Sequence, residues 1–272
     1  MLTDRPDMDY SHLDRPEILM GLFHPRPEYE SSEKNEHAVD VLIPAEGDIV
    51  VGGRFHMGAG KSATTILFFH GNGEIVADYD ELGPLYNSMG LNFLPVDYRG
   101  YGRSTGTPTV TALMRDCHAV FHFARGWLQE NGYKGPFVVM GRSLGSASAL
   151  ELASHYKKQI DGLVVESGFA YTGPLLELLG IDLSGIGFRE EEGAGNLEKI
   201  KSWNKSTLII HAELDHLIPF SDAQALFDAC ASPDKTLVNI PGANHNDIFM
   251  RGLDIYMEAV TTLCGMMKKR VD

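Results

Sequence analysis

Short runs of consecutive apolar residues recur along most of this chain, and longer stretches with apolar residues at helical spacing lie between them. Continuous apolar runs are typical of strands that are buried on both faces. We expect strands at residues 64–69, 92–96, 137–140, 162–165, 207–211 and 236–240. We expect helices at residues 75–89, 110–129, 146–156, 221–230 and 248–267. Strands that alternate with helices predict crossover connections, and therefore a mostly parallel sheet with helices on both faces.

The start of the chain follows a different pattern. Residues 1–37 are polar and proline-rich apart from a short apolar stretch at 18–23, which predicts an N-terminal arm with one docked turn. Two β-like runs follow at 38–43 and 49–56, with a turn between them, and they predict an antiparallel hairpin. We expect residues 38–272 to form a single α/β domain.

One long segment interrupts the alternation of strands and helices. Residues 167–206 are rich in glycine, carry the acidic run Glu190 to Glu192 and have a weak helical pattern. Long connections inside compact α/β domains are often lids or binding loops. We therefore expect a small cap or lid here, with a loosely helical surface segment as the alternative.

The strand expected at 137–140 leads directly into Gly141-Arg142-Ser143-Leu144-Gly145, and a helical pattern begins at Ser146. G-x-S-x-G between a strand and a helix indicates a nucleophile elbow, a serine held in strained geometry on a sharp turn. Larger side chains at the two glycines would collide with the turn. We expect an exposed Ser143 Oγ and, at the helix N-terminus, a Leu144 N–H that binds an oxyanion.

Ligands of parallel α/β sheets bind at the carboxyl ends of the strands, and polar residues of this chain gather there. A nucleophilic serine needs a base that takes its proton and an acid that orients the base. Ser143, Asp215 and His245 follow three different strands, in the chain order that accompanies the nucleophile elbow. We predict that these residues form a catalytic triad of nucleophile, orienting acid and general base.

Other acids and histidines lie near the same strand ends: Glu166, Glu213, Asp247, His70, His211 and His216. Asp215 is preferred as the acid because it lies four residues past a strand end, just before Ile218 and Pro219 open the next helix. We expect Glu213 to face solvent or to make a local hydrogen bond, and the three histidines to be structural or to support loops. Neither an H-E-x-x-H motif nor a Cys/His cluster is present, so we expect no metal and no cofactor.

The loop after the first parallel strand is the expected source of a second oxyanion donor. His70-Gly71-Asn72-Gly73 fits this role, because its glycines allow backbone N–H groups to approach a ligand closely. We predict that the Asn72 N–H acts beside the Leu144 N–H, with a plain glycine-rich turn as the alternative. Residues 57–62 only superficially resemble a phosphate loop, since the first glycine of that motif would fall on Phe55.

Composition narrows the classes of partner. The net charge is −14, which argues against nucleic-acid binding and against docking on anionic membranes. Cys117, Cys230 and Cys264 form neither a metal pattern nor a disulfide framework, which favours reduced thiols and a cytoplasmic location. We recognise no signal peptide at the N-terminus, and no apolar run approaches the roughly 20 residues that cross a bilayer.

The motifs from His70 to His245, with the hairpin in front of them, resemble the α/β-hydrolase fold superfamily. The tract Pro95-Val-Asp-Tyr-Arg-Gly-Tyr-Gly-Arg-Ser-Thr-Gly106 is similar to that of BEM46-like and related ABHD-type serine hydrolases. This resemblance implies structural roles for Asp97 and Arg99, and a place near the pocket for Tyr98.

The same resemblance implies hydrolysis of a small-molecule ester or thioester through an acyl-serine intermediate, without a cofactor. Two alternatives remain open at this point. One is a serine peptidase or lipid hydrolase that uses the same triad. The other is a non-catalytic binding protein that has kept the hydrolase fold.

Overall fold

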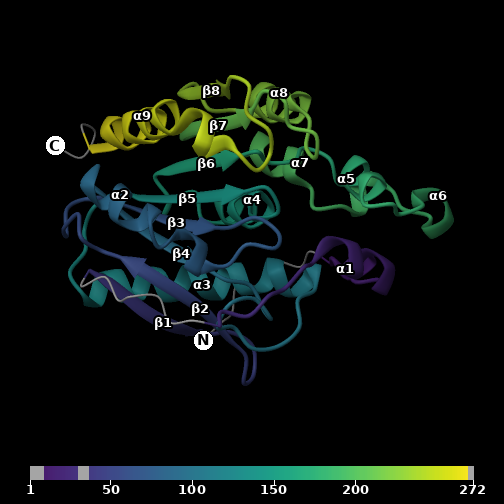
Figure 1. The fold of residues 1–272 in the computed structure, drawn as a ribbon, viewed down its shortest axis with the longest axis horizontal. Coiled ribbons are helices and arrows are strands. Elements are labelled where there is room, and N and C mark those ends of the chain that lie inside the picture. Colours follow the sequence, from purple (N-terminus) through teal and green to yellow (C-terminus); the bar gives the residue numbers. More distant parts are fainter. Residues whose placement is uncertain (1–8, 30–36, 269–272) are drawn as a thin grey trace.

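The computed structural model describes residues 9–29 and 37–268, in which one eight-stranded sheet runs through the molecule in the order β1-β2-β4-β3-β5-β6-β7-β8 (Figure 1). The strands are β1 (Ala38–Pro44), β2 (Val50–His56), β3 (Thr64–Phe69), β4 (Leu91–Val96), β5 (Phe137–Arg142), β6 (Gly162–Glu166), β7 (Ser206–Ala212) and β8 (Lys235–Ile240). Residues 1–8, where we expected no signal peptide, and residues 30–36 of the expected arm lie outside the described residues, as do residues 269–272.

Strand pairing confirms the predicted architecture. β1 and β2 form the antiparallel hairpin, and β2 pairs antiparallel with β4. The remaining neighbours, from β4 through β3 to β8, pair in parallel. The carboxyl ends of β3, β5, β6, β7 and β8 therefore lie along one edge of the sheet, where their loops can meet.

Helices cover both faces of this sheet (Figure 1). They are η1 (Ser11–Leu13), α1 (Pro16–Leu22), η2 (Val76–Tyr79), α2 (Leu82–Ser88), α3 (Val110–Glu130), α4 (Gly145–His155), α5 (Thr172–Leu178), α6 (Leu183–Ile186), η3 (Glu190–Glu192), α7 (Asn196–Lys201), α8 (Phe220–Ala229) and α9 (Ile248–Lys268). Side chains of α3, α4 and α8 share one core cluster, and those of α2 and α9 share the other. In the described part of the chain, no helix is both long and apolar enough to cross a bilayer.

The pattern of β3 explains why continuous apolar runs mark these strands. Leu67 and Phe69 belong to the core cluster of α3 and α4, whereas Ile66 and Phe68 belong to the cluster of α2 and α9. Successive side chains of a strand point to opposite faces, and here both faces are covered by helices. Apolar residues are therefore needed at every position.

The prediction of a single helix at residues 75–89 is wrong. The structure has the short turn η2 followed by the separate helix α2. The Asp78 carboxylate accepts a hydrogen bond from the Ile75 N–H at 2.9 Å, which closes the first turn locally. Pro84 then lies in the first turn of α2, where a helix does not require its missing N–H. A helix running unbroken from Ile75 would have placed this proline in its interior.

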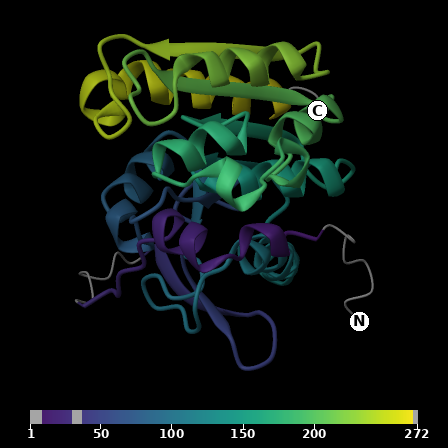
Figure 2. The ribbon, with the colours of Figure 1, turned by 90° about the vertical axis from the view of Figure 1, so that its right-hand side faces the viewer.

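The N-terminal arm and the segment 167–206 lie beside the carboxyl edge of the sheet. Figure 1 shows α1 and α5 on the side toward which β5 and β6 point, and Figure 2 looks onto that side. Ile18 of α1 is fully buried, and the Arg15 guanidinium donates to the Ile186 carbonyl at 2.8 Å. The arm is thus packed into the core and also contacts the segment that contains α5 to α7.

A buried carboxylate joins α4 to these elements. Glu151 accepts a hydrogen bond from the Tyr10 hydroxyl at 2.9 Å and lies 2.7 Å from the Lys199 ammonium. His118 of α3 lies 3.3 Å from its other oxygen. Burial by itself would raise the pKa of Glu151, but the contacts with His118 and Lys199 lower that pKa to about 2.

We predict that Glu151→Gln lowers the free energy of unfolding at pH 7 by about 3 kcal/mol, because the buried Lys199 ammonium loses its counter-charge. The pKa of Glu151 is about 2 in the folded protein against an ordinary 4.5. Its stabilising contribution is therefore present above pH 4.5 and is lost as the pH falls toward 2. Urea unfolding should show a wild-type-to-variant difference that is smaller at pH 3 than at pH 7.

The double variant Glu151→Gln, Lys199→Met is the control for this prediction. It removes both charges together, so it should recover much of the stability that the single change loses. A single-variant difference of the same size at both pH values would contradict the assigned role of the carboxylate.

Candidate active site

The backbone of the elbow has no room for side chains at its two glycines. A Cβ on Gly141 would lie 2.2 Å from the Gly145 carbonyl oxygen, and a Cβ on Gly145 would lie 2.1 Å from the Phe69 carbonyl oxygen. The N-terminus of α4 therefore passes directly against β5 and β3. Ser143, at the centre of this turn, has a φ of 50°, a left-handed value that is strained for a residue with a side chain.

The structure brings Ser143, His245 and Asp215 together. The His245 Nε2 lies 2.9 Å from the Ser143 Oγ, and the His245 Nδ1 lies 2.7 Å from the Asp215 Oδ2. The three residues come from the loops after β5, β8 and β7, and the side chains of His245 and Asp215 are buried. Residues distant in sequence thus form one chain of hydrogen bonds.

Backbone contacts hold the Asp215 carboxylate in place. Its Oδ1 accepts hydrogen bonds from the N–H groups of Leu217 and Ile218, at 3.0 and 2.9 Å, which leaves Oδ2 for His245. Burial acts to raise the pKa of Asp215, but the hydrogen bond from His245 and the charge of that ring bring the pKa below its ordinary value. An ionised carboxylate can only accept, so Nδ1 carries the proton and Nε2 is left to accept from Ser143.

The other acids near the strand ends have different contacts. The exposed Glu213 accepts a hydrogen bond from the Gly242 N–H at 2.7 Å. Asp247 accepts from the Asn244 N–H at 2.6 Å, within the loop that carries His245. Both acids therefore brace the backbone around the candidate histidine. Glu213 makes the local hydrogen bond that the sequence analysis expected.

The remaining histidines have structural contacts or lie on the surface. His70 is buried, with Nδ1 2.8 Å from the Gly71 carbonyl, and Nε2 of the buried His211 lies 2.8 Å from the Ile218 carbonyl. His216 is exposed. The first two contacts support the loops after β3 and β7, as expected for these side chains.

The two candidate oxyanion donors lie in the elbow itself and in the loop after β3. Leu144 directly precedes α4, so its N–H is at the helix N-terminus, where the helix itself leaves N–H groups unpaired. Asn72 is half-buried in the loop after β3. Its side-chain Oδ1 accepts from the His24 N–H at 2.9 Å and from the Tyr101 hydroxyl at 2.7 Å. The arm and the loop after β4 thus hold the Asn72 side chain.

Residues that follow β4 make hydrogen bonds to the loop after β3 and to the elements beside it. The buried Tyr98 donates to the His70 carbonyl, so its hydroxyl braces the loop. The Asp97 carboxylate accepts a hydrogen bond from the Val76 N–H at 2.9 Å. Arg99 forms a bidentate ion pair with Asp116, in which Nε and Nη2 donate to the two carboxylate oxygens at 2.6 and 2.8 Å. These contacts are the structural roles that the family resemblance implied for Asp97 and Arg99.

Sequence reasoning missed three residues that contact the candidate site. His24 and Tyr101 hold the Asn72 side chain, and Arg142 donates to the His245 carbonyl at 2.9 Å. Arg142 had a detectable signal, because it is a charged residue at the end of an otherwise buried strand. His24 had none, since its contact depends on how the arm crosses the sheet edge.

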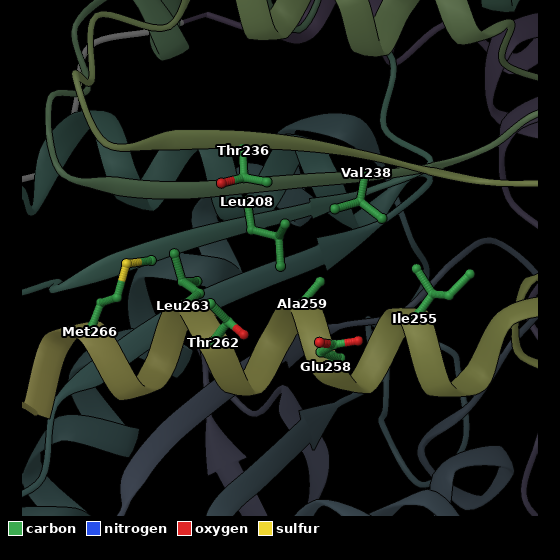
Figure 3. Close-up of a pocket in the computed structure, with 9 residues that line it drawn as sticks. All are labelled: Leu208, Thr236, Val238, Ile255, Glu258, Ala259, Thr262, Leu263 and Met266. Carbon is green, nitrogen blue, oxygen red and sulfur yellow. The ribbon is translucent and has the colours of Figure 1, made fainter.

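Two hollows differ in their relation to the site. Leu144 and Ala147 line a mainly apolar cavity of about 20 Å³, together with Leu13 and Leu22 of the arm. Figure 3 shows a wider groove between the β7–β8 pair and α9, lined mainly by apolar side chains. The nine residues of that groove include neither a serine nor a histidine, so it offers no acid–base chemistry of the kind found at Ser143.

One group of side chains has spacing that could suit a metal ion. His118, Glu151 and His155 place one donor atom each within 4.8 Å of one another. The Lys199 ammonium, however, lies 2.7 Å from Glu151 and would repel a cation. The group is better described as a buried ion pair flanked by two histidines.

Comparison with known proteins gives matches consistent with this geometry. The family model described as "Serine aminopeptidase, S33" matches residues 60–180. The chain is 28% identical over 203 residues to the uncharacterized protein YfhR of Escherichia coli K12, covering 74% of this chain and 69% of that protein. It is 31% identical over 198 residues to the human alpha/beta hydrolase domain-containing protein 17B, and this match covers 69% of this chain and 62% of that protein.

A third relative is the protein bem46 of Schizosaccharomyces pombe, 27% identical over 194 residues, with 69% of this chain and 63% of that protein covered. Among solved structures, the esterase Pf2001 of Pyrococcus furiosus superposes with a TM-score of 0.71 at 19% identity, covering 90% of this chain and all of that one. The order of the strands and the antiparallel pairing of β1 and β2 at the start of the sheet are consistent with this structural similarity. The chain has the α/β-hydrolase fold, and its sequence is similar to those of BEM46-like and ABHD-type proteins.

Proposed function

We propose that this protein is a serine hydrolase that cleaves carboxylic ester or thioester bonds of small molecules with a Ser143–His245–Asp215 triad. The observation that carries the proposal is the continuous hydrogen-bond chain from the Ser143 Oγ to the Asp215 carboxylate, with distances of 2.9 and 2.7 Å. The strained backbone of Ser143 adds support, because strain of this kind is concentrated at functional sites.

The mechanism follows from this proton arrangement. His245 Nε2 takes the hydroxyl proton of Ser143 as the Oγ attacks the carbonyl carbon of the substrate. The Leu144 and Asn72 N–H groups stabilise the negative oxygen of the tetrahedral intermediate. The intermediate collapses, the bond to the leaving alkoxide or thiolate breaks, and His245 returns the proton to that group. Water activated by His245 then hydrolyses the acyl-serine, which releases the acid and restores Ser143.

One comparison bears on the acyl group. The structure of Est1E from Butyrivibrio proteoclasticus, which superposes with a TM-score of 0.67 at 20% identity, was solved with ferulic acid bound. The acid of a compact ester is therefore the substrate fragment that we expect here.

A serine peptidase is the second candidate, because the matching family model is described as a serine aminopeptidase. The same triad could cleave an amide, provided that His245 protonates the leaving amine. Turnover of aminoacyl p-nitroanilides at a kcat/KM above that for p-nitrophenyl acetate would favour the peptidase. The opposite order would favour the esterase.

We also propose that residues 38–272 form the hydrolase domain and that the segment 167–206 acts as its small cap. The supporting contacts hold this segment together and join it to the arm, and its residues Leu175 and Leu176 line the same cavity as Leu144. The Thr172 N–H and the Gly173 N–H both bond to Glu190 within the segment, at 2.6 and 2.7 Å, and Arg15 of the arm reaches the Ile186 carbonyl. Segment and arm together lie over the carboxyl edge of the sheet (Figure 2).

We predict that a fluorophosphonate probe labels Ser143, because an activated hydroxyl is required for this reaction. Ser143→Ala should abolish labelling and turnover of p-nitrophenyl acetate while leaving the unfolding temperature within a few degrees of the wild type. Mass spectrometry of the labelled peptide locates the adduct. Ser148→Ala changes a buried serine of α4, the helix that follows the elbow, and should label like the wild type. An unlabelled, folded wild-type protein would favour the non-catalytic binding protein.

We predict that Asp215→Asn lowers kcat by about 10³- to 10⁴-fold, because an amide in place of the carboxylate favours the wrong histidine tautomer. Steady-state kinetics with p-nitrophenyl acetate measures the effect. Glu213→Gln is the matched control, since Glu213 is a nearby acid that contacts Gly242 instead of His245. Its kcat should stay within about threefold of the wild type. A similar loss in both variants would remove Asp215 from the triad.

A further inference from the structure

Arg142 directly precedes Ser143, and its guanidinium lies beneath the candidate site. The residue is only 5% exposed. Three nitrogens of one side chain reach three different partners: Nε donates to Glu74 at 2.8 Å, Nη1 to Glu166 at 3.1 Å and Nη2 to the His245 carbonyl at 2.9 Å. A planar guanidinium is rigid, so these three contacts fix their partners relative to one another.

The first partner connects Arg142 to the loop that carries Asn72. Glu74 Oε1 accepts from Arg142, while Oε2 accepts from the Gly71 N–H at 2.7 Å and from the Tyr79 hydroxyl at 2.6 Å. Burial would raise the pKa of Glu74, but the charge of Arg142 and the Tyr79 hydroxyl lower it to about 2. The carboxylate therefore remains ionised and bridges Arg142 to the backbone of the loop after β3.

The second and third partners lie on the opposite side of the elbow. Glu166, fully buried at the end of β6, accepts from Arg142 and from the Tyr256 hydroxyl of α9 at 2.7 Å. Its own carbonyl accepts the Ser143 N–H at 2.9 Å. The contact with the His245 carbonyl then anchors the backbone of the candidate base itself.

We propose that Arg142 is a positioning residue for the hydrolysis, which sets the place of the His245 loop and of the Asn72 loop relative to Ser143. The proposal rests on the proposed function of Ser143. Asp215 orients the imidazole ring, but a hydrogen bond to the ring does not determine where the histidine backbone lies. Arg142 contacts the His245 backbone itself, from the residue adjacent to the nucleophile, whereas Glu213 and Asp247 contact only neighbouring residues of that loop. Small displacements matter, because about 1 Å of misplacement can cost roughly 10²-fold in rate.

The alternative is that Arg142 only stabilises the fold, and Arg54 offers a matched comparison. Arg54 is 6% exposed and also has three partners, which here are all carboxylates: those of Glu28, Asp40 and Asp80. These acids lie away from the elbow, on the arm, on β1 and after η2. Glu28 and Asp40 also contact Arg103, so they keep a cationic partner when Arg54 is changed.

The experiment compares Arg142→Lys with Arg54→Lys. Each keeps the positive charge, but one ammonium cannot reproduce three divergent contacts. With p-nitrophenyl acetate, Arg142→Lys should lower kcat by about 10- to 100-fold with KM nearly unchanged, because Arg142 is not expected to touch the substrate. Arg54→Lys should lower the unfolding temperature about as much as Arg142→Lys does, but its kcat should stay within about threefold of the wild-type value. Equal kcat values for the two variants would overturn the proposal.

Proton NMR supplies a reading that does not require turnover. The His245 Nδ1 proton, bonded to Asp215, should give a resonance at unusually low field, identified by its loss in His245→Ala. This resonance should shift or broaden in Arg142→Lys and stay unchanged in Arg54→Lys. If wild-type Ser143 is not labelled by fluorophosphonate, the proposed function fails, and the resonance still tests whether Arg142 holds the histidine. An unchanged resonance in Arg142→Lys would overturn the positioning role.

Glu74→Gln takes the place of Arg142→Lys if that variant does not fold. The amide is isosteric and can still accept from Arg142 through its oxygen, but its nitrogen cannot accept from the Gly71 N–H. The loop after β3 therefore keeps its contact with Arg142 through residue 74 but loses the hydrogen bond that joins this side chain to the Gly71 backbone. A kcat lowered at least about tenfold with unchanged KM would support the proposal, and a kcat equal to that of the wild type would overturn it.

Discussion

The close approach of the α4 backbone to β5 and β3 is the constraint on which the candidate site depends. It forbids a Cβ at Gly141 and at Gly145, and it accompanies the left-handed conformation of Ser143. The turn brings the serine hydroxyl to the carboxyl edge of the sheet, beside the N-terminus of a helix. Parallel strand pairing then brings the loops after β7 and β8 to the same edge, so that Asp215 and His245 can reach it.

Several charged side chains are buried at this edge of the sheet. Their burial costs free energy, but their contacts also fix the positions of the loops. An isolated buried ion is strongly unfavourable, so each must have partners that satisfy its hydrogen bonds. Arg142 meets two carboxylates and a carbonyl, and the hydroxyls of Tyr79 and Tyr256 complete the shells of Glu74 and Glu166. Removing one member leaves others unpaired, which restricts the loops to one set of positions.

The sheet was predictable from sequence because both its faces are buried and its strands are continuous apolar runs. The elbow and the Ser, Asp, His order were visible for a related reason, since each falls at a strand end where the local pattern changes. The break at residues 80–81 was missed although Gly83-Pro84 signalled it. The contacts of Arg142 and His24 were not predictable, because they depend on side-chain reach between strands and on the path of the arm, neither of which leaves a periodic pattern.

The backbone strain at Ser143 and the buried charge of Arg142 are relevant to the function of this site. Ser143 has a backbone conformation that costs of order 1–3 kcal/mol, and a glycine there would relieve it. Buried ion pairs such as Arg142 with Glu166 are often no more stabilising than apolar residues of similar size. A protein that only bound a ligand at this edge would gain stability by losing both features. Their presence at one point, next to a serine within hydrogen-bond distance of a histidine, supports the proposed acyl transfer.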